Sequence, residues 1–288
     1  MAIDYQALKN WRIGDIDHHY TQRDVMLYAL GVGIGADPVD PAQLRFVYEE
    51  GLCVLPSFAL VMGYPGFWIR DPAIGVDWTK VLNVEQGIVM HRPLPTGGHV
   101  IGRNRVEEIF DKGADKGALV YTSRDVVDAQ SGQLLCQVTQ TIMCRGDGGF
   151  GGPAMQTPRP TAPVPDTPPT MFFDMKTLPQ AALIYRLSGD YNPLHADPQV
   201  ARSVGFAQPI LHGAALFGIA TYSLLHMLCN GMPAGLKQMN VRFSSPVYPG
   251  ETVRTELWKT GAGQAVFRAR VLERNVVALN GGTARFEA

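Results

Sequence analysis

The short segment from Asp190 to His195 carries the side chains best suited to chemistry. It reads Asp-Tyr-Asn-Pro-Leu-His and follows Ser188-Gly189. An Asp carboxylate and a His imidazole held close together can bind one water molecule from two sides, and either can take its proton as a general base. Such help accelerates a reaction by roughly 10²- to 10⁴-fold. The spacing therefore favours activation of a water molecule by Asp190 and His195.

Local signals place this segment on a rigid loop between two helices. Asn192 precedes a proline, which disfavours helical backbone at that position. Asp197 followed by Pro198 is typical of the cap and first residue of a new helix. Loops on rigid scaffolds often carry function. We therefore expect Asp190, Asn192 and His195 to share one loop, with Asp197 as a structural cap.

A second candidate feature is Gly213, at the start of a long apolar stretch that runs to residue 229. A stretch that is apolar nearly all round predicts a buried helix, and Asn230-Gly231 is a typical stop signal. The Gly213 amide would then be an unpaired donor at the positive end of the helix dipole. A donor in this position can stabilise a carbonyl oxygen that gains negative charge, which contributes about 2.7–4 kcal/mol in catalysis.

Each candidate also has a structural interpretation. Asp190 can be a turn residue, His195 a buried core histidine, and Asn192 a residue that only stabilises the turn. A metal site built from Asp190, His195 and His212 is conceivable, but the spacing matches no standard zinc motif. His212 alone is better explained as structural. We therefore predict no metal ion.

A proline-rich segment divides the chain. Residues 151–170 include seven prolines, which lack an amide donor and fit neither a helix nor a central strand. We interpret this segment as an extended linker. It separates an N-terminal domain, residues 1–150, from a C-terminal domain, residues 171–288.

The two halves are predicted to share one order of elements, as expected for a duplicated fold. In the first, a helix from Thr21 to about Leu30 precedes strands at about 83–91, 99–112, 117–128 and 133–145. In the second, helices at about 179–187 and 213–229 precede strands at about 237–245, 251–260, 264–274 and 276–286. A sheet wrapped around a central helix fits each half. In the first half Pro65 breaks that helix after about two turns, and the volume left unfilled is either collapsed or a pocket.

Composition limits the partners. The 288 residues carry a net charge of −1 and have a sequence pI of about 6.6, so no broad basic field is available for nucleic acid. No apolar run approaches the roughly 18 residues that a membrane span needs. The N-terminus lacks a signal-peptide pattern, and the C-terminus lacks a peroxisomal tripeptide. We expect a cytoplasmic protein that binds neither nucleic acid nor membrane.

The motif around Asp190 matches the pattern of one protein family in detail. The stretch Leu187–Pro198, taken together with Pro209-Ile-Leu-His-Gly213, resembles the signature of the MaoC-like, R-specific enoyl-CoA hydratase family (hydratase 2). Segments around Val54 and Arg242 agree with the two-repeat members. The resemblance implies an α+β double hotdog, with two antiparallel sheets each wrapped around a central helix. It also implies an acyl-CoA thioester substrate, no separate cofactor and a possible homodimer.

The resemblance also implies a role for each site residue. Asp190 and His195 would hold and activate the water, Asn192 would support them, and the amide of Gly213 would bind the thioester oxygen. The N-terminal half would be catalytically silent and would accommodate the acyl chain. The product would be a (3R)-hydroxyacyl-CoA, or the enoyl-CoA in the reverse direction. The sequence departs from relatives at Asn83-Val84, where His-Gly is frequent, but this position lies in the silent half.

Three other functions fit the same motif. One is a dehydratase for a specialised acyl-CoA with a branched dicarboxylic or steroid side chain. Another is an acyl-CoA thioesterase, and a third is a non-catalytic acyl-CoA binding protein. The intact pair of Asp190 and His195 argues against the last.

Overall fold

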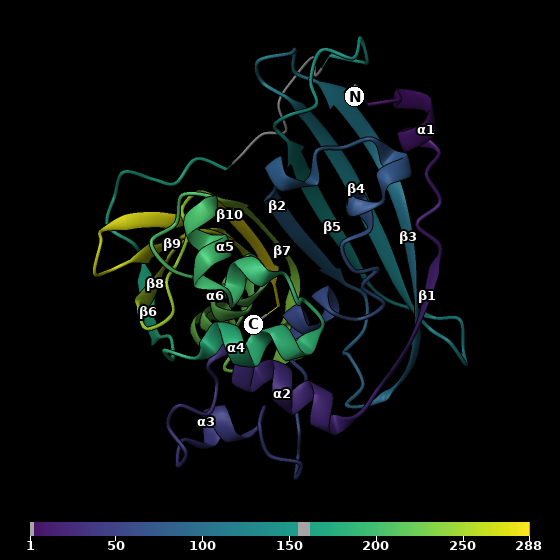
Figure 1. Ribbon diagram of the computed structural model, residues 1–288. Coiled ribbons are helices and arrows are strands. Elements are labelled where there is room, and N and C mark those ends of the chain that lie inside the picture. Colours follow the sequence, from purple (N-terminus) through teal and green to yellow (C-terminus); the bar gives the residue numbers. More distant parts are fainter. Residues whose placement is uncertain (1–2, 155–161, 288) are drawn as a thin grey trace.

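Long apolar and β-branched segments build one antiparallel sheet of ten strands in the computed structural model, which describes residues 3–154 and 162–287 (Figure 1). The strands of the first half are β1 (Asp15–Tyr20), β2 (Val81–Met90), β3 (Gly98–Asp111), β4 (Ala118–Asp128) and β5 (Leu134–Cys144). Those of the second half are β6 (Met171–Lys176), β7 (Leu236–Phe243), β8 (Thr252–Gly261), β9 (Gln264–Val271) and β10 (Val276–Phe286).

Helices occupy the concave side of the sheet and its ends. The α-helices are α1 (Tyr5–Lys9), α2 (Gln22–Val32), α3 (Pro41–Leu44), α4 (Ala181–Tyr185), α5 (Pro198–Ser203) and α6 (Gly213–Leu228). Short 3₁₀ helices are η1 (Pro56–Leu60), η2 (Trp68–Arg70), η3 (Pro72–Ile74), η4 (Trp78–Lys80), η5 (Arg186–Ser188), η6 (Pro193–His195) and η7 (Pro233–Gly235). Among the helices of the described residues, none combines the length and apolar character that a bilayer crossing requires.

The two halves repeat one strand order and meet at equivalent strands. The first half runs β1-β3-β4-β5-β2, and the second continues β7-β10-β9-β8-β6, which is the same order reversed. The seam is the antiparallel pair β2 and β7, in register from Glu85 opposite Arg242 to Val89 opposite Gln238. The double hotdog is therefore confirmed. The two sheets predicted separately are joined edge to edge into one.

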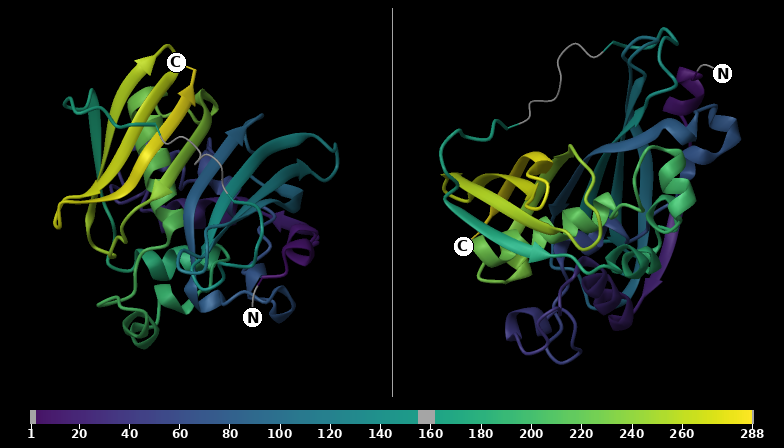
Figure 2. Two further views of the ribbon diagram at one scale, coloured as in Figure 1. Left: turned by 90° about the horizontal axis from the view of Figure 1, so that it is seen from above. Right: turned by 60° about the vertical axis from the view of Figure 1, so that its left-hand side comes forward.

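The second half wraps around α6, as the sequence predicts. Nearly every residue of α6 is buried, and Figures 1 and 2 show it lying inside the curl formed by β6 to β10. The helix ends at Cys229, after which the amide of Gly231 donates to the carbonyl of Leu225 at 2.9 Å. This closing bond is one that glycine favours after a helix.

The first half differs at its centre. In place of a central α-helix it has η1, a 3₁₀ turn of five buried residues that starts at Pro56. The chain then turns at Gly63, whose φ of +59° favours glycine. A Cβ on Gly63 would also lie 2.5 Å from the Cα of Gly102. The central helix of this half is thus shorter than the sequence predicts, because the chain must turn before Pro65.

Helix α2 of the first half packs directly on α4 of the second (Figure 1). Asp24 accepts a hydrogen bond from the amide of Thr21 at 2.8 Å, which starts α2 as predicted. Near the other end, Gly31 lies so close to α4 that a Cβ would be 2.9 Å from the Cα of Tyr185. This contact joins the two halves of the chain a few residues before the loop that carries Asp190 and His195.

The linker prediction stays a prediction. Part of the segment 151–170, residues 155–161, lies outside the described residues. The boundaries of the two domains are likewise untested.

Candidate active site

The candidate loop lies between η5 and α5, as predicted. Helix η5 ends at Gly189, whose φ is +114°, a conformation that glycine adopts at low cost. Asp190 follows, and Asn192 is the cap of η6, which ends at His195. Asp197 then caps α5 by accepting a hydrogen bond from the amide of Gln199 at 2.7 Å, so its predicted capping role is confirmed.

Asn192 holds the loop in shape. Its Oδ1 accepts a hydrogen bond from the amide of Leu194 at 3.0 Å. Its own amide donates to Oδ1 of Asp190 at 3.2 Å. These bonds fix the Asp190 carboxylate relative to the turn that carries His195. The observed contacts of Asn192 are therefore those of a positioning residue.

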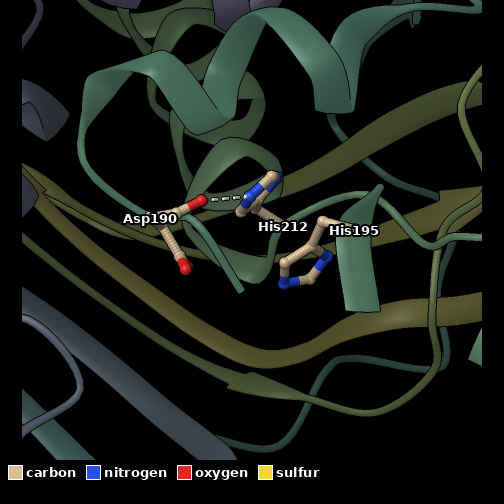
Figure 3. Close-up of side chains that lie close together, drawn as sticks. All are labelled: Asp190, His195 and His212. Carbon is tan, nitrogen blue, oxygen red and sulfur yellow. Dashed lines mark hydrogen bonds between the residues drawn. The ribbon is translucent and has the colours of Figure 1, made fainter. Parts of the chain in front are cut away.

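His212, directly before α6, connects the loop to the central helix (Figure 3). Its Nε2 donates to the main-chain carbonyl oxygen of Asp190 at 3.2 Å. Its ring stacks on His195, with centroids 3.7 Å apart and planes 27° apart. His212 thus contacts both Asp190 and His195. The sequence predicted a structural role for His212, but it did not predict these contacts.

The hydrogen bonds of His195 determine which ring nitrogen is available. Its Nδ1 lies 2.8 Å from the carbonyl oxygen of Ile210. A carbonyl only accepts, so we assign the proton to Nδ1, which leaves the lone pair of Nε2 free to take a proton. Burial lowers the pKa of His195, although the negative charge of Asp190 opposes this effect. The neutral, basic form is therefore favoured at neutral pH.

His212 is held neutral more strongly. Burial and the neighbouring His195 lower its pKa to about 3, and the hydrogen bond to the carbonyl of Asp190 opposes them. The side chain is fully buried, and its Nδ1 has no partner among the described residues. A neutral ring stacked on His195 positions that base without adding a second charge.

Gly213 is the first residue of α6, where the sequence predicts a free amide. No carbonyl four residues earlier in the helix exists to accept its N–H. A Cβ at this position would meet the ring of Phe243 at 3.2 Å. Glycine therefore lets Phe243 approach the start of the helix and leaves the amide uncovered by a side chain of its own.

Tyr64, in the first half of the chain, lies close enough to Asp190 to be influenced by its charge, and no sequence motif indicated it. Burial, with the nearby charge of Asp190, raises the pKa of Tyr64 to about 12, and the charge of Arg124 opposes them. Tyr185, the last residue of α4, lies under the site with its ring 4.9 Å from that of His212. The sequence signal that could have indicated Tyr64 is Pro65, which follows it directly and marks where the chain turns after η1.

Asp190, His195 and His212 offer possible metal-ligand atoms within 4.8 Å of one another. An imidazole directs its lone pair in the plane of the ring, and zinc sits about 2.0–2.1 Å from each nitrogen. The two stacked rings lie 3.7 Å apart in planes only 27° apart, so an ion in the plane of one ring would lie out of the plane of the other. The geometry disfavours a metal here, and the absence of a metal stays a prediction.

Comparisons with known proteins agree on one family. The MaoC like domain matches residues 160–281, and the MFE-2 hydratase 2 N-terminal domain matches residues 18–146. The chain is 40% identical to 3-hydroxyacyl-thioester dehydratase Y of Mycobacterium tuberculosis over 88% of this chain and 86% of that protein. It is 35% identical to the peroxisomal enoyl-CoA hydratase 2 of Arabidopsis thaliana, over 94% and 91% of the two chains.

A solved structure is similar over nearly its whole length. The MaoC-like dehydratase from Phytophthora capsici superposes with a TM-score of 0.85 at 34% identity, covering 98% of both chains. The sequence profiles, the named relatives and the fold therefore point to the same group of proteins.

Proposed function

Since the chain belongs to the MaoC-like dehydratase family and is a hydro-lyase, we propose that it interconverts a trans-2-enoyl-CoA and a (3R)-hydroxyacyl-CoA. The observation that carries this proposal is the free Nε2 of His195 beside the carboxylate of Asp190. The dehydratase and hydratase named above act in the two directions of this reaction type. Concentrations of substrate and product set the direction.

In the hydration direction, the pair first activates a water molecule. Asp190 and His195 bind the water from two sides, and one of them takes its proton while the oxygen forms a bond to C3 of the enoyl group. The π electrons of the C2–C3 double bond move toward the thioester, whose oxygen becomes enolate-like. The N–H of Gly213 donates to this oxygen at the positive end of α6.

The second half of the reaction returns a proton. The enolate re-forms the thioester carbonyl, and C2 takes the proton from the group that received it or from its partner. Water has then been added across the double bond with no change in oxidation state, so the chemistry requires no redox cofactor. Two strongly interacting groups share their protonation, so neither Asp190 nor His195 alone is assigned as the base.

We also propose where the acyl chain lies, which oligomer the protein forms and where in the cell it is found. The shortened centre of the first half, at η1 and Tyr64, provides the direction in which the acyl chain would extend. A homodimer and a cytoplasmic location stay predictions, and the Arabidopsis relative is named peroxisomal. Size-exclusion chromatography with light scattering tests the first, and imaging of a tagged chain tests the second.

The test follows loss of enoyl absorbance with crotonyl-CoA and a long-chain trans-2-enoyl-CoA. Asp190→Asn and His195→Gln are each expected to reduce kcat by about 10²- to 10⁴-fold. Asp197→Asn and His226→Gln are matched controls. Asn caps a helix about as well as Asp, and His226 lies at an exposed position on the far part of α6. Both controls are expected to keep wild-type activity.

The product distinguishes this proposal from its rivals. Chiral chromatography of the hydroxyacyl product is expected to give the 3R form. Release of free CoA thiol without hydration would instead identify a thioesterase. Binding of acyl-CoA without turnover, unchanged by Asp190→Asn, would identify a binding protein. Activity that survives both active-site substitutions would contradict the assigned site.

A further inference from the structure

Arg124 is a buried cation on the concave face of β4. Only 6% of the residue is exposed. Its Nη2 donates to the main-chain carbonyls of Leu60 at 2.6 Å and Ala59 at 3.2 Å, at the end of η1. Burial lowers the pKa of Arg124 to about 10, which still leaves the guanidinium charged at neutral pH.

This cation has no anionic partner among the described residues. The neighbouring carboxylate, Asp125, lies on the opposite face of β4 and accepts from Nη1 of Arg105 at 2.7 Å. The groups that favour the charged form of Arg124 are the weakly acidic Cys136 and Tyr64. Its Nε is buried and has no hydrogen-bond partner within the part of the chain that the structure describes. Burying an ion without a counterion is strongly unfavourable, so an incoming anion would be stabilised here.

Arg124 also contacts Tyr64, and the segment it caps packs toward the active site. The guanidinium carbon lies 5.6 Å from the centroid of the Tyr64 ring. The pKa of Tyr64 is raised by the charge of Asp190 and lowered by that of Arg124. Ring contacts link the same region to the site, because Tyr28 packs against Phe58 of η1 and against Tyr185, whose ring lies 4.9 Å from that of His212.

We propose that Arg124 binds a carboxylate on the acyl chain of the substrate, so that the protein acts on enoyl-CoA thioesters whose chain carries a second, distal carboxylate. This inference rests on the proposed hydratase function. With the thioester oxygen at Gly213 and C3 beside Asp190 and His195, an acyl chain that extended toward η1 would bring its far end to Arg124. The planar guanidinium, with Nε still unpaired, suits a carboxylate.

The deciding experiment compares pairs of trans-2-enoyl-CoA substrates of equal chain length, one ending in a carboxylate and one in a methyl group. Several lengths are assayed, because only one places the carboxylate at Arg124. At the best length, the wild-type kcat/KM is expected to favour the carboxylate substrate by about 100-fold, the size of a buried charge pair. Arg124→Gln, which keeps donors for the carbonyls of η1, is expected to abolish this preference while it retains turnover of the methyl substrate.

Arg103→Leu is the matched control, because this arginine lies on the adjacent strand and is mostly exposed. It is expected to leave the preference unchanged. Equal use of both substrates by wild type at every length would overturn the proposal. A parallel loss on both substrates in Arg124→Gln, with a lower melting temperature, would make Arg124 only a cap for η1 and would also overturn it. No turnover of any substrate by wild type would instead contradict the hydratase function itself.

Discussion

At the scale of single residues, the neutral state of His195 has a consequence for pH dependence. Burial lowers its pKa below the ordinary 6.5. As pH falls, the ring therefore gains its proton, and stops acting as a base, only below pH 6.5. We predict that the acidic limb of the kcat/KM profile has its midpoint below pH 6.5. A midpoint above that value would show that the free-enzyme base is not a buried, neutral histidine.

Gly213 gives a second prediction at this scale. Its replacement by Ala would place a Cβ 3.2 Å from the ring of Phe243, so the ring or the helix start must move. A small displacement of a catalytic donor is costly, and we expect kcat to fall by about 10- to 100-fold while KM changes little. Gly261→Ala is the control, because nothing lies within 4 Å of the added Cβ. A higher KM with an unchanged kcat would show that this amide does not stabilise the oxyanion.

Several site residues could be identified from the sequence because they lie close together in it. Asp190, Asn192 and His195 share one loop, and Gly213 opens the next long helix. Tyr64 and Arg124 were missed because they come from distant segments of the other half. A signal for Arg124 existed. Nearly every position of β4 is buried, on both faces of the strand, and a charged residue such as Arg124 in a strand of this kind is unusual.

At the scale of elements, the contact of α2 with α4 positions the active-site loop. Gly31→Ala would bring a Cβ within 2.9 Å of the Cα of Tyr185, and backbone cannot yield as a flexible side chain can. We expect a loss of about 1–3 kcal/mol of stability. We also expect a lower kcat, because the active-site loop begins at Gly189, four residues after Tyr185. Thermal unfolding and the enoyl assay measure the two effects. A stable, fully active Gly31→Ala would show that the helices are free to separate.

The long elements could be predicted because each has a strong apolar pattern. The four strands predicted in each half, and α6, begin and end within a few residues of the prediction. Strands β1 and β6 were missed. Both are edge strands of six residues, and they alternate exposed with part-buried positions in polar or mixed sequences, such as Asp-Ile-Asp-His-His-Tyr in β1. Short edge strands carry little hydrophobic signal, because only one side of their backbone is paired.

At the scale of the whole molecule, the buried histidines predict acid sensitivity. The pKa values of His18, His195 and His212 are all lowered from 6.5, that of His212 to about 3. Below pH 6.5 the unfolded chain binds protons at these positions while the folded chain does not. Stability is therefore fully present above pH 6.5 and declines as pH falls toward 3.

The measurement is the melting temperature at pH 7.5, 6.5 and 5, a range above the ordinary pKa of carboxylates. We expect little change between the first two values and a decrease at pH 5. His212→Phe removes the largest of the three shifts, so its melting temperature is expected to fall less over the same range. An identical decrease in both proteins would show that His212 does not contribute.

The seam between β2 and β7 pairs equivalent strands, as the interface of a symmetric dimer would. In a dimer of identical chains, every mutation appears twice, and a change that enlarges a pocket also alters its symmetry-related active site. Joining the copies in one polypeptide removes that constraint. The two halves of one polypeptide can differ, as they do here, where the second half carries Asp190, His195 and α6 and the first carries η1 and the buried Arg124. The asymmetry of this chain is thus an evolutionary freedom that two separate, identical subunits do not have.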